Sequence, residues 1–343
     1  MSSSAKALVA VGAMVANRLL LLDAYAFLRR KLTGSQVAIL LYHRIGSEYA
    51  GWSLRPKPLS SQIFESQMEY FCHNFEILSL DRLAHHLLQG SLPEKAAVIT
   101  FDDGYKDNYL YAYPILKKYH IPATMFLTTG HIGTDKLFWW DKVSYIIRHT
   151  AVKQLDLSDL GCLPLQSESD KIHANSLITE RLKKLPDEEK NLLIEKLFNI
   201  SGTVIPPGLG RELILSWDEV IEMSNDGIAF GAHSVNHPVL TNLPLEQAKG
   251  EILQSKQDIE EKLGKVVTTF AYPNGDFNAE LVKFIGESGF VCAVSVLPGK
   301  LISSKDNIYQ LSRIAPIEDF NKCMGKFSGL WGDLQDTILR LRR

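Results

Sequence analysis

The stretch that most constrains the fold is a short apolar run, 96–99, followed closely by two adjacent carboxylates, Asp102 and Asp103. A continuous apolar run without alternation is typical of a strand buried on both faces, as in a parallel sheet. Gly104 favours a turn directly after the two carboxylates. They then either cap a helix that begins near Tyr105 or act together at one site.

Apolar runs and helical periodicity alternate along much of the chain. Strands are predicted at 37–44, 75–80, 96–102, 123–128, 228–232, 266–271, 290–296 and 308–314. Most are separated by segments with helical spacing, at 60–75, 82–89, 106–120, 217–225, 245–263 and 278–288. This order predicts an α/β fold of the β/α-barrel type, in which functional groups gather at the carboxyl ends of the strands.

Residues 131–212 interrupt the alternation, so the barrel is assigned to 34–130 and 213–318. The interrupting region contains two helical segments separated at Pro186 and has few aromatic residues. Such a stretch offers only a small core. It is therefore predicted to be a largely helical insertion packed over one end of the barrel. Trp139 and Trp140 either anchor it in the core, the simpler interpretation, or stack on a sugar ring.

The composition excludes one class of partner. Lys and Arg total 37 against 39 Asp and Glu, and the formal net charge is −2. The chain therefore lacks the basic field of a nucleic-acid-binding protein, and no nucleic-acid partner is predicted. The four cysteines form no CxxC pair, which argues against a zinc knuckle or a redox motif.

Both ends of the chain carry patterns related to membranes. The apolar part of segment 1–33 is interrupted by Arg18 and followed by Arg29-Arg30-Lys31. A central Arg costs about 2.5–3.5 kcal/mol on insertion scales, and the basic cluster would keep the rest of the chain in the cytoplasm. We expect a membrane-surface or loosely inserted helix, with a helix packed on the domain as the alternative. The amphipathic basic tail, 319–343, fits packing on the barrel or a membrane contact.

These patterns give the expected location. It is the cytoplasmic face of the membrane or the cytoplasm, and an extracytoplasmic location stays open.

Two histidines follow the predicted strand 228–232. His233 and His237 are four residues apart, so they share one face if the backbone turns helical there, and both imidazoles can then reach one cation. Taken alone, this spacing fits structural histidines better. Their place at a strand end, like that of Asp102 and Asp103, favours a site with one Asp and two His ligands and positions open for water and substrate.

Three motifs in order make the sequence recognisable. They are Thr100-Phe101-Asp102-Asp103-Gly104-Tyr105, His233-Ser234-Val235-Asn236-His237-Pro238 and Phe270-Ala271-Tyr272-Pro273-Asn274-Gly275. Together they resemble the first three motifs of the polysaccharide deacetylase family, the NodB-homology carbohydrate esterases of the family 4 type. The resemblance covers roughly 36–130 and 213–316. It implies a distorted (β/α)7-8 barrel that removes acetyl groups from carbohydrates with a divalent metal, usually Zn²⁺.

The resemblance also implies roles for individual residues. Asp103, His233 and His237 would be the metal ligands, and Asp102 the general base. The backbone N–H of Asn274 matches the position that helps to hold the oxyanion. These roles agree with the chemistry, because amide hydrolysis needs an activated water, a site for the oxyanion and a proton for the departing amine.

The sequence departs from the commonest family pattern in two places. The third motif contains no Arg to pair with the base, and no His follows His237. His43, in Leu41-Tyr42-His43-Arg44-Ile45, resembles the acid of the permuted poly-N-acetylglucosamine deacetylases, with a satisfied core histidine as the alternative. Arg313, at the end of the last predicted strand, is predicted to replace the missing Arg and keep Asp102 ionised. A surface ion pair explains Arg313 equally well.

The sequence therefore predicts a metal-dependent N-deacetylase that acts on N-acetylated amino sugars of a polysaccharide or lipid-linked glycan. One alternative is a deformylase or non-sugar amidase on the same metal site, because the motifs define water activation and not the acyl pocket. Another is a carbohydrate-binding protein that has lost catalysis, because the Arg of the third motif is missing.

Overall fold

The structure is a computed structural model that describes residues 31, 34–46, 57–296 and 300–316. The predicted membrane-associating segment, 1–33, lies outside the described residues except for Lys31, and so does the tail, 319–343. Across the described ranges, no helix is both long enough and apolar enough to span a bilayer.

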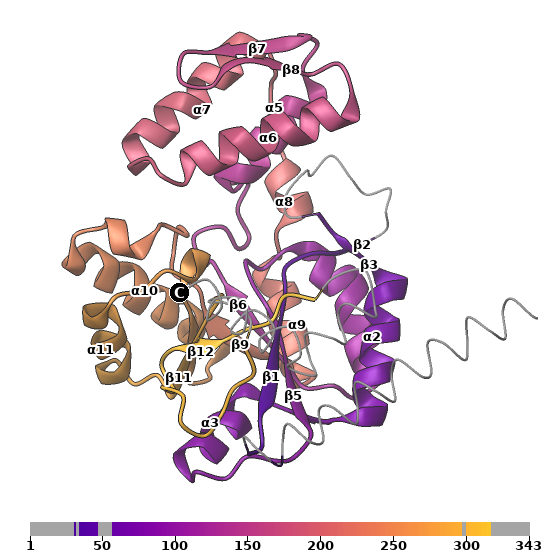
Figure 1. The fold of residues 1–343 in the computed structure, drawn as a ribbon, viewed down its shortest axis with the longest axis vertical. Helices are drawn as coiled ribbons and strands as arrows, with labels where there is room; N and C mark the ends of the chain where they lie inside the picture. The colour runs from indigo at the N-terminus through magenta and orange to yellow at the C-terminus, as the bar shows by residue number, and fades with distance from the viewer. Residues whose placement is uncertain (1–30, 32–33, 47–56, 297–299, 317–343) are drawn as a thin grey trace, which may run out of the picture.

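Eight strands form one parallel sheet that curls into a nearly closed barrel (Figure 1). They are β1 (Val37–Tyr42), β4 (Glu76–Leu78), β5 (Ala96–Phe101), β6 (Ala123–Leu127), β9 (Ala229–Ala232), β10 (Thr269–Ala271), β11 (Cys292–Ser295) and β12 (Leu311–Ser312). The spatial order is β1-β5-β6-β9-β10-β11-β12, and β4 also pairs with β5. Every predicted strand is present, and the predicted β/α barrel is confirmed.

The barrel closes between its first and last strands. Just beyond β12, the Ile314 N–H donates to the Ile39 carbonyl at 2.8 Å, and the Leu41 N–H donates to the Ile314 carbonyl at 3.0 Å. The carboxyl end of β12 therefore lies beside the carboxyl end of β1. This closure brings residues from both ends of the chain to one rim.

Helices surround the sheet, as Figure 1 shows. They are α2 (Ser61–Asn74), α3 (Leu80–Leu88), α4 (Tyr113–Lys118), α9 (Trp217–Asn225), α10 (Leu245–Leu263) and α11 (Ala279–Glu287). Short elements complete the barrel: the small strands β2 (Ile45–Gly46) and β3 (Leu59–Ser60), the π-helical turn η1 (Asn108–Ala112), and the 3₁₀ turns η2 (Leu240–Asn242) and η3 (Pro273–Gly275). The helix predicted at 106–120 is thus divided into η1 and α4.

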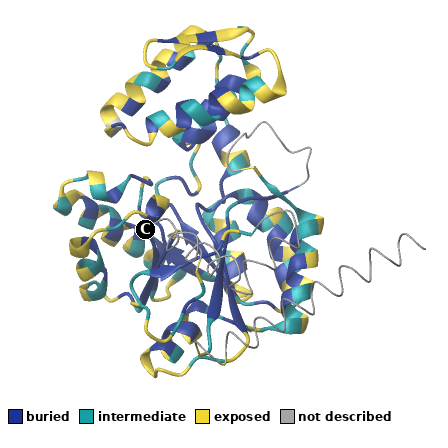
Figure 2. Cartoon of the chain, in the orientation of Figure 1, coloured by how far each residue is buried: buried dark blue, intermediate teal, exposed yellow. Residues whose placement is uncertain are grey.

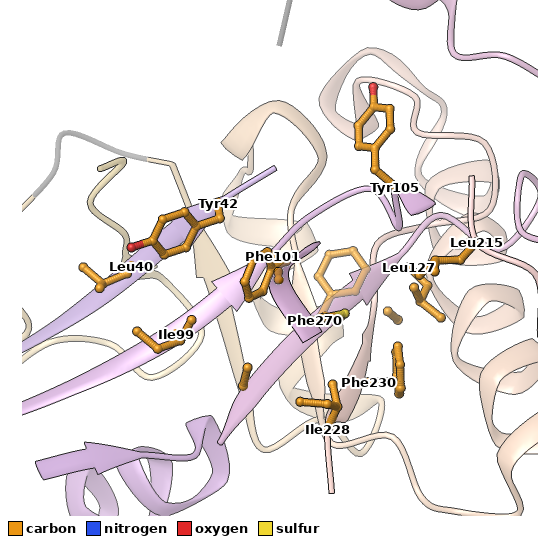
Figure 3. Close-up of a cluster of buried hydrophobic side chains, with 14 of the residues drawn as sticks. Leu40, Tyr42, Ile99, Phe101, Tyr105, Leu127, Leu215, Ile228, Phe230 and Phe270 are labelled. Atoms are coloured by element: carbon orange, nitrogen blue, oxygen red, sulfur yellow. The ribbon is translucent and has the colours of Figure 1, made fainter. Parts of the chain in front are cut away.

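The central strands are apolar because both of their faces are covered. Every residue of β1 and of β5 is buried, and the buried strands contrast with the exposed outer faces of the helices in Figure 2. Side chains such as Tyr42, Phe101 and Phe270 fill the core shown in Figure 3. The rings of Tyr42 and Phe101 stack at 5.3 Å between centroids. Burial of this apolar surface holds the strand ends, and the polar residues that follow them, in fixed positions.

The insertion forms a lobe above the barrel in Figure 1. It contains α5 (Trp139–His149), a hairpin of β7 (Gln154–Leu157) and β8 (Gly161–Pro164), α6 (Glu168–Leu182) and α7 (Asp187–Ser201). The lobe is largely helical, and the antiparallel hairpin is an element that we did not predict. It has a hydrophobic cluster of its own, formed by Val143, Ile146, Ile147, Leu155, Leu157, Leu163, Leu165, Ala174, Ile178, Leu182, Leu185, Ile194 and Leu197.

The lobe joins the barrel through packed and hydrogen-bonded connections. Ile132 and Phe138 pack in the core of the barrel although they precede α5. On the return path, the Asp135 carboxylate accepts the N–H groups of Gly208 and Gly210, at 2.7 and 2.9 Å, at the start of α8 (Leu209–Leu213). The entry and the exit of the lobe are therefore tied to each other.

Candidate active site

Asp102 and Asp103 diverge because the backbone turns between them. The Asp102 N–H still pairs with the Tyr42 carbonyl at 3.0 Å, so it extends the strand ladder by one residue. Asp103 and Gly104 then take positive φ values of 76° and 82°. A Cβ atom at Gly104 would lie 2.7 Å from the terminal methyl group of Ile132, and the positive φ by itself favours glycine at this position. The turn gives the two buried carboxylates different partners.

Asp102 faces a buried arginine from the far end of the chain. Arg313, directly after β12, is 1% exposed, and its two terminal nitrogens donate to the two Asp102 oxygens at 2.6 Å each. Burial opposes the charged carboxylate, but Arg313 and His233 together lower the pKa of Asp102 below its usual value. The predicted pairing of Arg313 with Asp102 is present and is buried, so the surface ion pair is excluded.

Asp103 faces the two histidines. Its Oδ1 lies 3.5 Å from the Nε2 of His233 and 3.5 Å from the Nε2 of His237. We expected a helical turn to bring the histidines together, and that expectation is wrong. Ser234 and His237 instead adopt left-handed φ values of 62° and 56°, and the Ser234 hydroxyl accepts the His237 N–H at 3.0 Å.

The geometry of these three side chains fits a divalent cation. One ligand atom from each of Asp103, His233 and His237 lies within 4.8 Å of the others, and no other such group occurs among the described residues. The buried Oδ1 of Asp103 has no hydrogen-bond partner. His233 donates from Nδ1 to the Ala271 carbonyl at 2.8 Å, so in the neutral ring the Nε2 lone pair, on the side of Asp103, can bind a cation.

The protonation states also suit a cation. Burial and the neighbouring His233 lower the pKa of His237 to about 3, so His237 is a neutral imidazole. Burial opposes a charge on His233 as well, but Asp102 and Asp103 raise its pKa. A cation bound at this group would displace the His233 proton, as metal ions do when they bind histidine.

Asp103, His233 and His237 line an open pocket of about 260 Å³. It is lined by His43, Asp102, Asp103, Trp139, Trp140, Thr179, Lys183, His233, His237, Asn274 and Val296. The structure therefore brings six of the seven predicted site residues into one pocket. The seventh, Arg313, is buried against Asp102.

Asn274 reaches the pocket from η3, which follows β10. It has a φ of 57°, and Gly275 follows with a φ of 80°. A Cβ atom at Gly275 would lie 2.6 Å from a Val296 methyl group and 2.8 Å from its backbone nitrogen. The Ser295 hydroxyl donates to the Gly275 carbonyl at 2.7 Å. The lack of a side chain at Gly275 lets the turn approach Val296 closely, and the Ser295 hydrogen bond holds the turn, and with it Asn274, against the end of β11.

The comparison with protein families decides the identity. A family model described as polysaccharide deacetylase matches residues 89–293. The chain belongs to the polysaccharide deacetylase family. The resemblance of the three motifs is thereby confirmed, and the protein is a hydrolase of this deacetylase family.

Relatives of this family member extend the comparison. YxkH of Bacillus subtilis (strain 168) is 26% identical over 82% of this chain and 71% of its own length. The poly-beta-1,6-N-acetyl-D-glucosamine N-deacetylase of Staphylococcus aureus (strain MSSA476) is 39% identical over 87 residues, which are 25% of this chain and 30% of that protein.

Solved structures share the fold. The Streptococcus pyogenes deacetylase PplD, in complex with acetate, has a TM-score of 0.57 and 20% identity, over 84% of this chain and 98% of that one. IcaB from Ammonifex degensii has a TM-score of 0.56 and 17% identity, over 87% and 98% of the two chains.

The lobe forms one side of the deacetylase pocket. Trp140 packs in the barrel core at 9% exposure, Trp139 packs between the two cores, and both line the pocket. Core anchoring is thus observed, and stacking on a sugar stays a prediction. Thr179 and Lys183, at the end of α6, complete this side.

The sequence did not reveal a buried polar network beside His237. The Tyr105 hydroxyl donates to Asp141 at 3.0 Å, and Trp140 donates its indole N–H to the Tyr105 oxygen at 2.7 Å. The Trp140 ring lies 4.8 Å from the His237 ring, nearly perpendicular to it. Burial raises the pKa of Asp141 to about 7. This network fixes the indole against one of the candidate ligands.

A second buried pair supports the turn after Asp103. Arg44 donates from Nε to Asp107 at 2.7 Å, and its guanidinium lies 4.8 Å from the centre of the Tyr105 ring. The Ile45 N–H donates to the other Asp107 oxygen at 3.3 Å. The only signal in the sequence was the position of these residues, Arg44 directly after His43 and Asp107 shortly after the first motif.

Proposed function

We propose that this protein removes the acetyl group from an N-acetylated amino sugar of a polysaccharide or lipid-linked glycan, with a divalent cation held by Asp103, His233 and His237. The observation that carries the proposal is that the two neighbouring carboxylates have different partners. Asp102 is neutralised by Arg313, whereas Asp103 faces two imidazoles with an unpartnered oxygen. The name of the Staphylococcus aureus relative supports an N-acetylglucosamine substrate.

Zinc is the cation that these side chains suit best. Two imidazole nitrogens and one carboxylate are a common ligand set of catalytic zinc sites, in which a further position stays open. When bound, such an ion polarises the acyl oxygen and lowers the pKa of water. The role of the chain is to hold the three ligands, and the hydrogen bond from His233 to the Ala271 carbonyl fixes one imidazole for this purpose.

Asp102 is suited to take a proton and not to bind the cation. Both of its oxygens accept hydrogen bonds from Arg313 at 2.6 Å, which holds them away from a ligand role. A carboxylate has further lone pairs, so it can still accept the proton of an attacking water. The lowered pKa of Asp102 keeps it ionised for this step.

His43 and Asn274 complete the mechanism from two other strand ends. His43 follows β1 and lines the pocket, where it can donate a proton to the departing amine. The backbone N–H of Asn274, in the turn that Gly275 locks, can donate to the oxyanion. Each step of the hydrolysis then has its own group at the rim of the barrel.

The test is the release of acetate from N-acetylglucosamine oligomers by the purified protein with added zinc. We expect turnover in the wild type and a loss of at least 100-fold in Asp102→Asn, because general base catalysis contributes about 10²–10⁴-fold. The zinc content of Asp102→Asn should equal that of the wild type. Asp276→Asn, an exposed carboxylate outside the pocket, is the matched control and should keep full activity.

Several outcomes would contradict the proposal. Equal activity of the wild type and Asp102→Asn would show that the site is not catalytic, and a protein that binds zinc without turnover on any amide would be a binding protein. Mass spectrometry of the products separates acetate from formate, so a deformylase or a non-sugar amidase would also be recognised.

We also propose that the protein works at the cytoplasmic face of a membrane. The support is the apolar sequence within 1–33 and the Arg29-Arg30-Lys31 cluster after it. Removal of residues 1–31 should move the protein from the membrane fraction to the supernatant without loss of zinc. An unchanged distribution after this truncation would contradict the proposal.

A further inference from the structure

A second pocket, of about 380 Å³, adjoins the deacetylase pocket and shares Trp139 and His237 with it. Its lining comes from the start of the lobe, from α7 and from the loop after β9: His131, Asp135, Lys136, Leu137, Lys142, Lys190, Asn191, Ile205, Asn236 and Pro238, besides the two shared residues. A group bound in this pocket would therefore lie next to the reacting centre.

The pocket is rich in positive charge. Lys136, Lys142 and Lys190 line it, and Asp135 is the only carboxylate among its lining residues. In the described part of the chain, the Asp135 carboxylate pairs with no lysine, because its oxygens accept hydrogen bonds from the backbone N–H groups of Gly208 and Gly210. A net positive charge therefore faces the interior of the pocket.

Two of these lysines have no anion beside them. Within the ranges that the structure describes, Lys136 and Lys142 take part in no ion pair; Lys136 is exposed and Lys142 is half-buried. Burial lowers the pKa of Lys142, so the ammonium is held where water solvates it poorly. A partly buried cation without a partner is costly, and a bound anion would remove that cost.

His131 provides a second, independent observation. It is 7% exposed and stacks on Phe138 at 4.2 Å, and its buried Nδ1 has no hydrogen-bond partner. Burial, together with the positive charges of Lys136 and Lys142, lowers the pKa of His131 to about 4. The His131 ring is therefore neutral, and its lowered pKa reports the positive potential that Lys136 and Lys142 create in this pocket.

We propose that this lysine-lined pocket binds an anionic group of the glycan, adjacent to the acetamido group that the deacetylase pocket receives. The proposal rests on the proposed function for the position of the acetamido group. The shared Trp139 separates the two binding positions, and the Lys190 ammonium lies 5.6 Å from the centre of its ring. The substrate would be an acidic glycan or a glycan with a phosphate on its sugar, and not a neutral polymer.

The test measures the binding of three probes by calorimetry to the zinc-loaded Asp102→Asn protein, which does not consume them. UDP-N-acetylglucosamine carries phosphate next to the acetamido sugar, a hyaluronan tetrasaccharide carries carboxylates, and N-acetylated chitotetraose is neutral. Lys136→Gln and Lys142→Gln remove the charges singly. Lys184→Gln, an exposed lysine of the same lobe that lines neither pocket, is the matched control.

We expect each pocket substitution to raise the Kd of at least one anionic probe about tenfold, since a hydrogen bond to a charged group is lost. The change for chitotetraose should be at least five times smaller, and Lys184→Gln should leave all three Kd values as they were. Added salt should weaken the anionic probe more than the neutral one. If only the binding of UDP-N-acetylglucosamine depends on the lysines, the anion is a phosphate. If only the binding of hyaluronan depends on them, the anion is a carboxylate.

The proposal is overturned if Lys136→Gln and Lys142→Gln, shown to be folded by circular dichroism, change no Kd or change all three equally. Its failure is distinct from that of the proposed function. Lysine-dependent binding without acetate release in the wild type would leave the anion pocket intact and remove the deacetylase assignment. Acetate release without lysine-dependent binding would remove only the anion pocket.

Discussion

Replacement of Arg313 with Met should raise the pH below which this deacetylase loses its activity. In the structure Arg313 is 1% exposed and contacts both oxygens of Asp102, which is 2% exposed. Methionine is of similar length and carries no charge, so Arg313→Met removes the cation and keeps the apolar part of the side chain. The base then remains buried without its principal counter-ion.

The magnitude follows from the loss of this one charge. An opposite charge at such a distance lowers the pKa of a carboxyl group by about 1–3 units. Asp102 acts as a base above its pKa, so its activity is present above that value and is lost as the pH falls through it. Arg313→Met raises the pKa, and the acidic limb of the kcat/KM profile should move up by about 1–3 pH units. A cation bound at the site would lower the pKa of Asp102 in both the wild type and Arg313→Met, so the difference between the two pKa values would remain.

Arg313→Met should also make the folded protein less stable. A carboxyl group with a lowered pKa in the folded state stabilises the protein above its unfolded pKa, and this contribution is lost as the pH falls through the folded pKa. Removal of one partner of a buried ion pair costs about 3–5 kcal/mol. The free energy of unfolding of Arg313→Met at neutral pH should therefore fall by roughly that amount.

The assay is kcat/KM for acetate release between pH 3 and pH 8, a range that includes the acidic limbs of both proteins, with zinc content and circular dichroism measured for each protein at each pH. Arg313→Lys keeps the charge but loses the bidentate contact, so its profile should lie between those of the wild type and Arg313→Met. The double variant Asp102→Asn/Arg313→Met has no unpaired buried charge and should recover stability relative to Arg313→Met. An unchanged acidic limb in folded Arg313→Met would refute the reasoning.

Three further predictions concern the supports of the site. Arg44→Met should leave Asp107 buried without its cation and lower the free energy of unfolding in denaturant titrations by about 3–5 kcal/mol; an unchanged denaturation midpoint would contradict this. Gly275→Ala should reduce kcat, because its Cβ would clash with the Val296 backbone at 2.8 Å, whereas Gly264→Ala, also at positive φ but with no atom within 4 Å, should lose only the roughly 1–2 kcal/mol of backbone strain. Zinc at 100 times its Kd should stabilise the chelator-treated protein by about 2.7 kcal/mol in thermal melts, and no shift in Tm would show that the Asp-His-His group does not bind zinc.

Much of the barrel could be predicted because its strands are continuous apolar runs. β1 and β5 are buried along their whole length, so their composition carries the signal by itself. Residues at strand ends could be placed for the same reason, since the carboxyl ends of parallel strands meet at one rim. That rule brought Arg313 to Asp102 across more than half of the sequence.

The local backbone at the site could not be predicted from spacing. The four-residue interval between His233 and His237 indicated a helical turn, yet the structure uses left-handed residues at Ser234 and His237. Non-glycine residues rarely adopt this conformation, so no propensity rule identifies them. Such strain is sustained by surrounding contacts, here by the Ser234 hydroxyl and the packing of the rings.

The hairpin of the lobe was missed although its signal is present. In β7, exposed Gln154 and Asp156 alternate with buried Leu155 and Leu157, which is the period of a half-buried strand. The Tyr105–Asp141–Trp140 network had no comparable signal. Its members lie 35 and 36 residues apart and meet only when the barrel and the lobe are assembled.

The separate core of the lobe has a consequence for how this enzyme can change. The side chains assigned to hydrolysis come from strand ends of the barrel, whereas Thr179, Lys183, Lys142 and Lys190 belong to a segment that packs largely on itself. Exchange of this segment for that of another family member would leave the hydrolytic residues in register. Exchange of the whole insertion, 131–212, with Trp140 and its hydrogen bond to Tyr105 retained, is where engineering of selectivity would start.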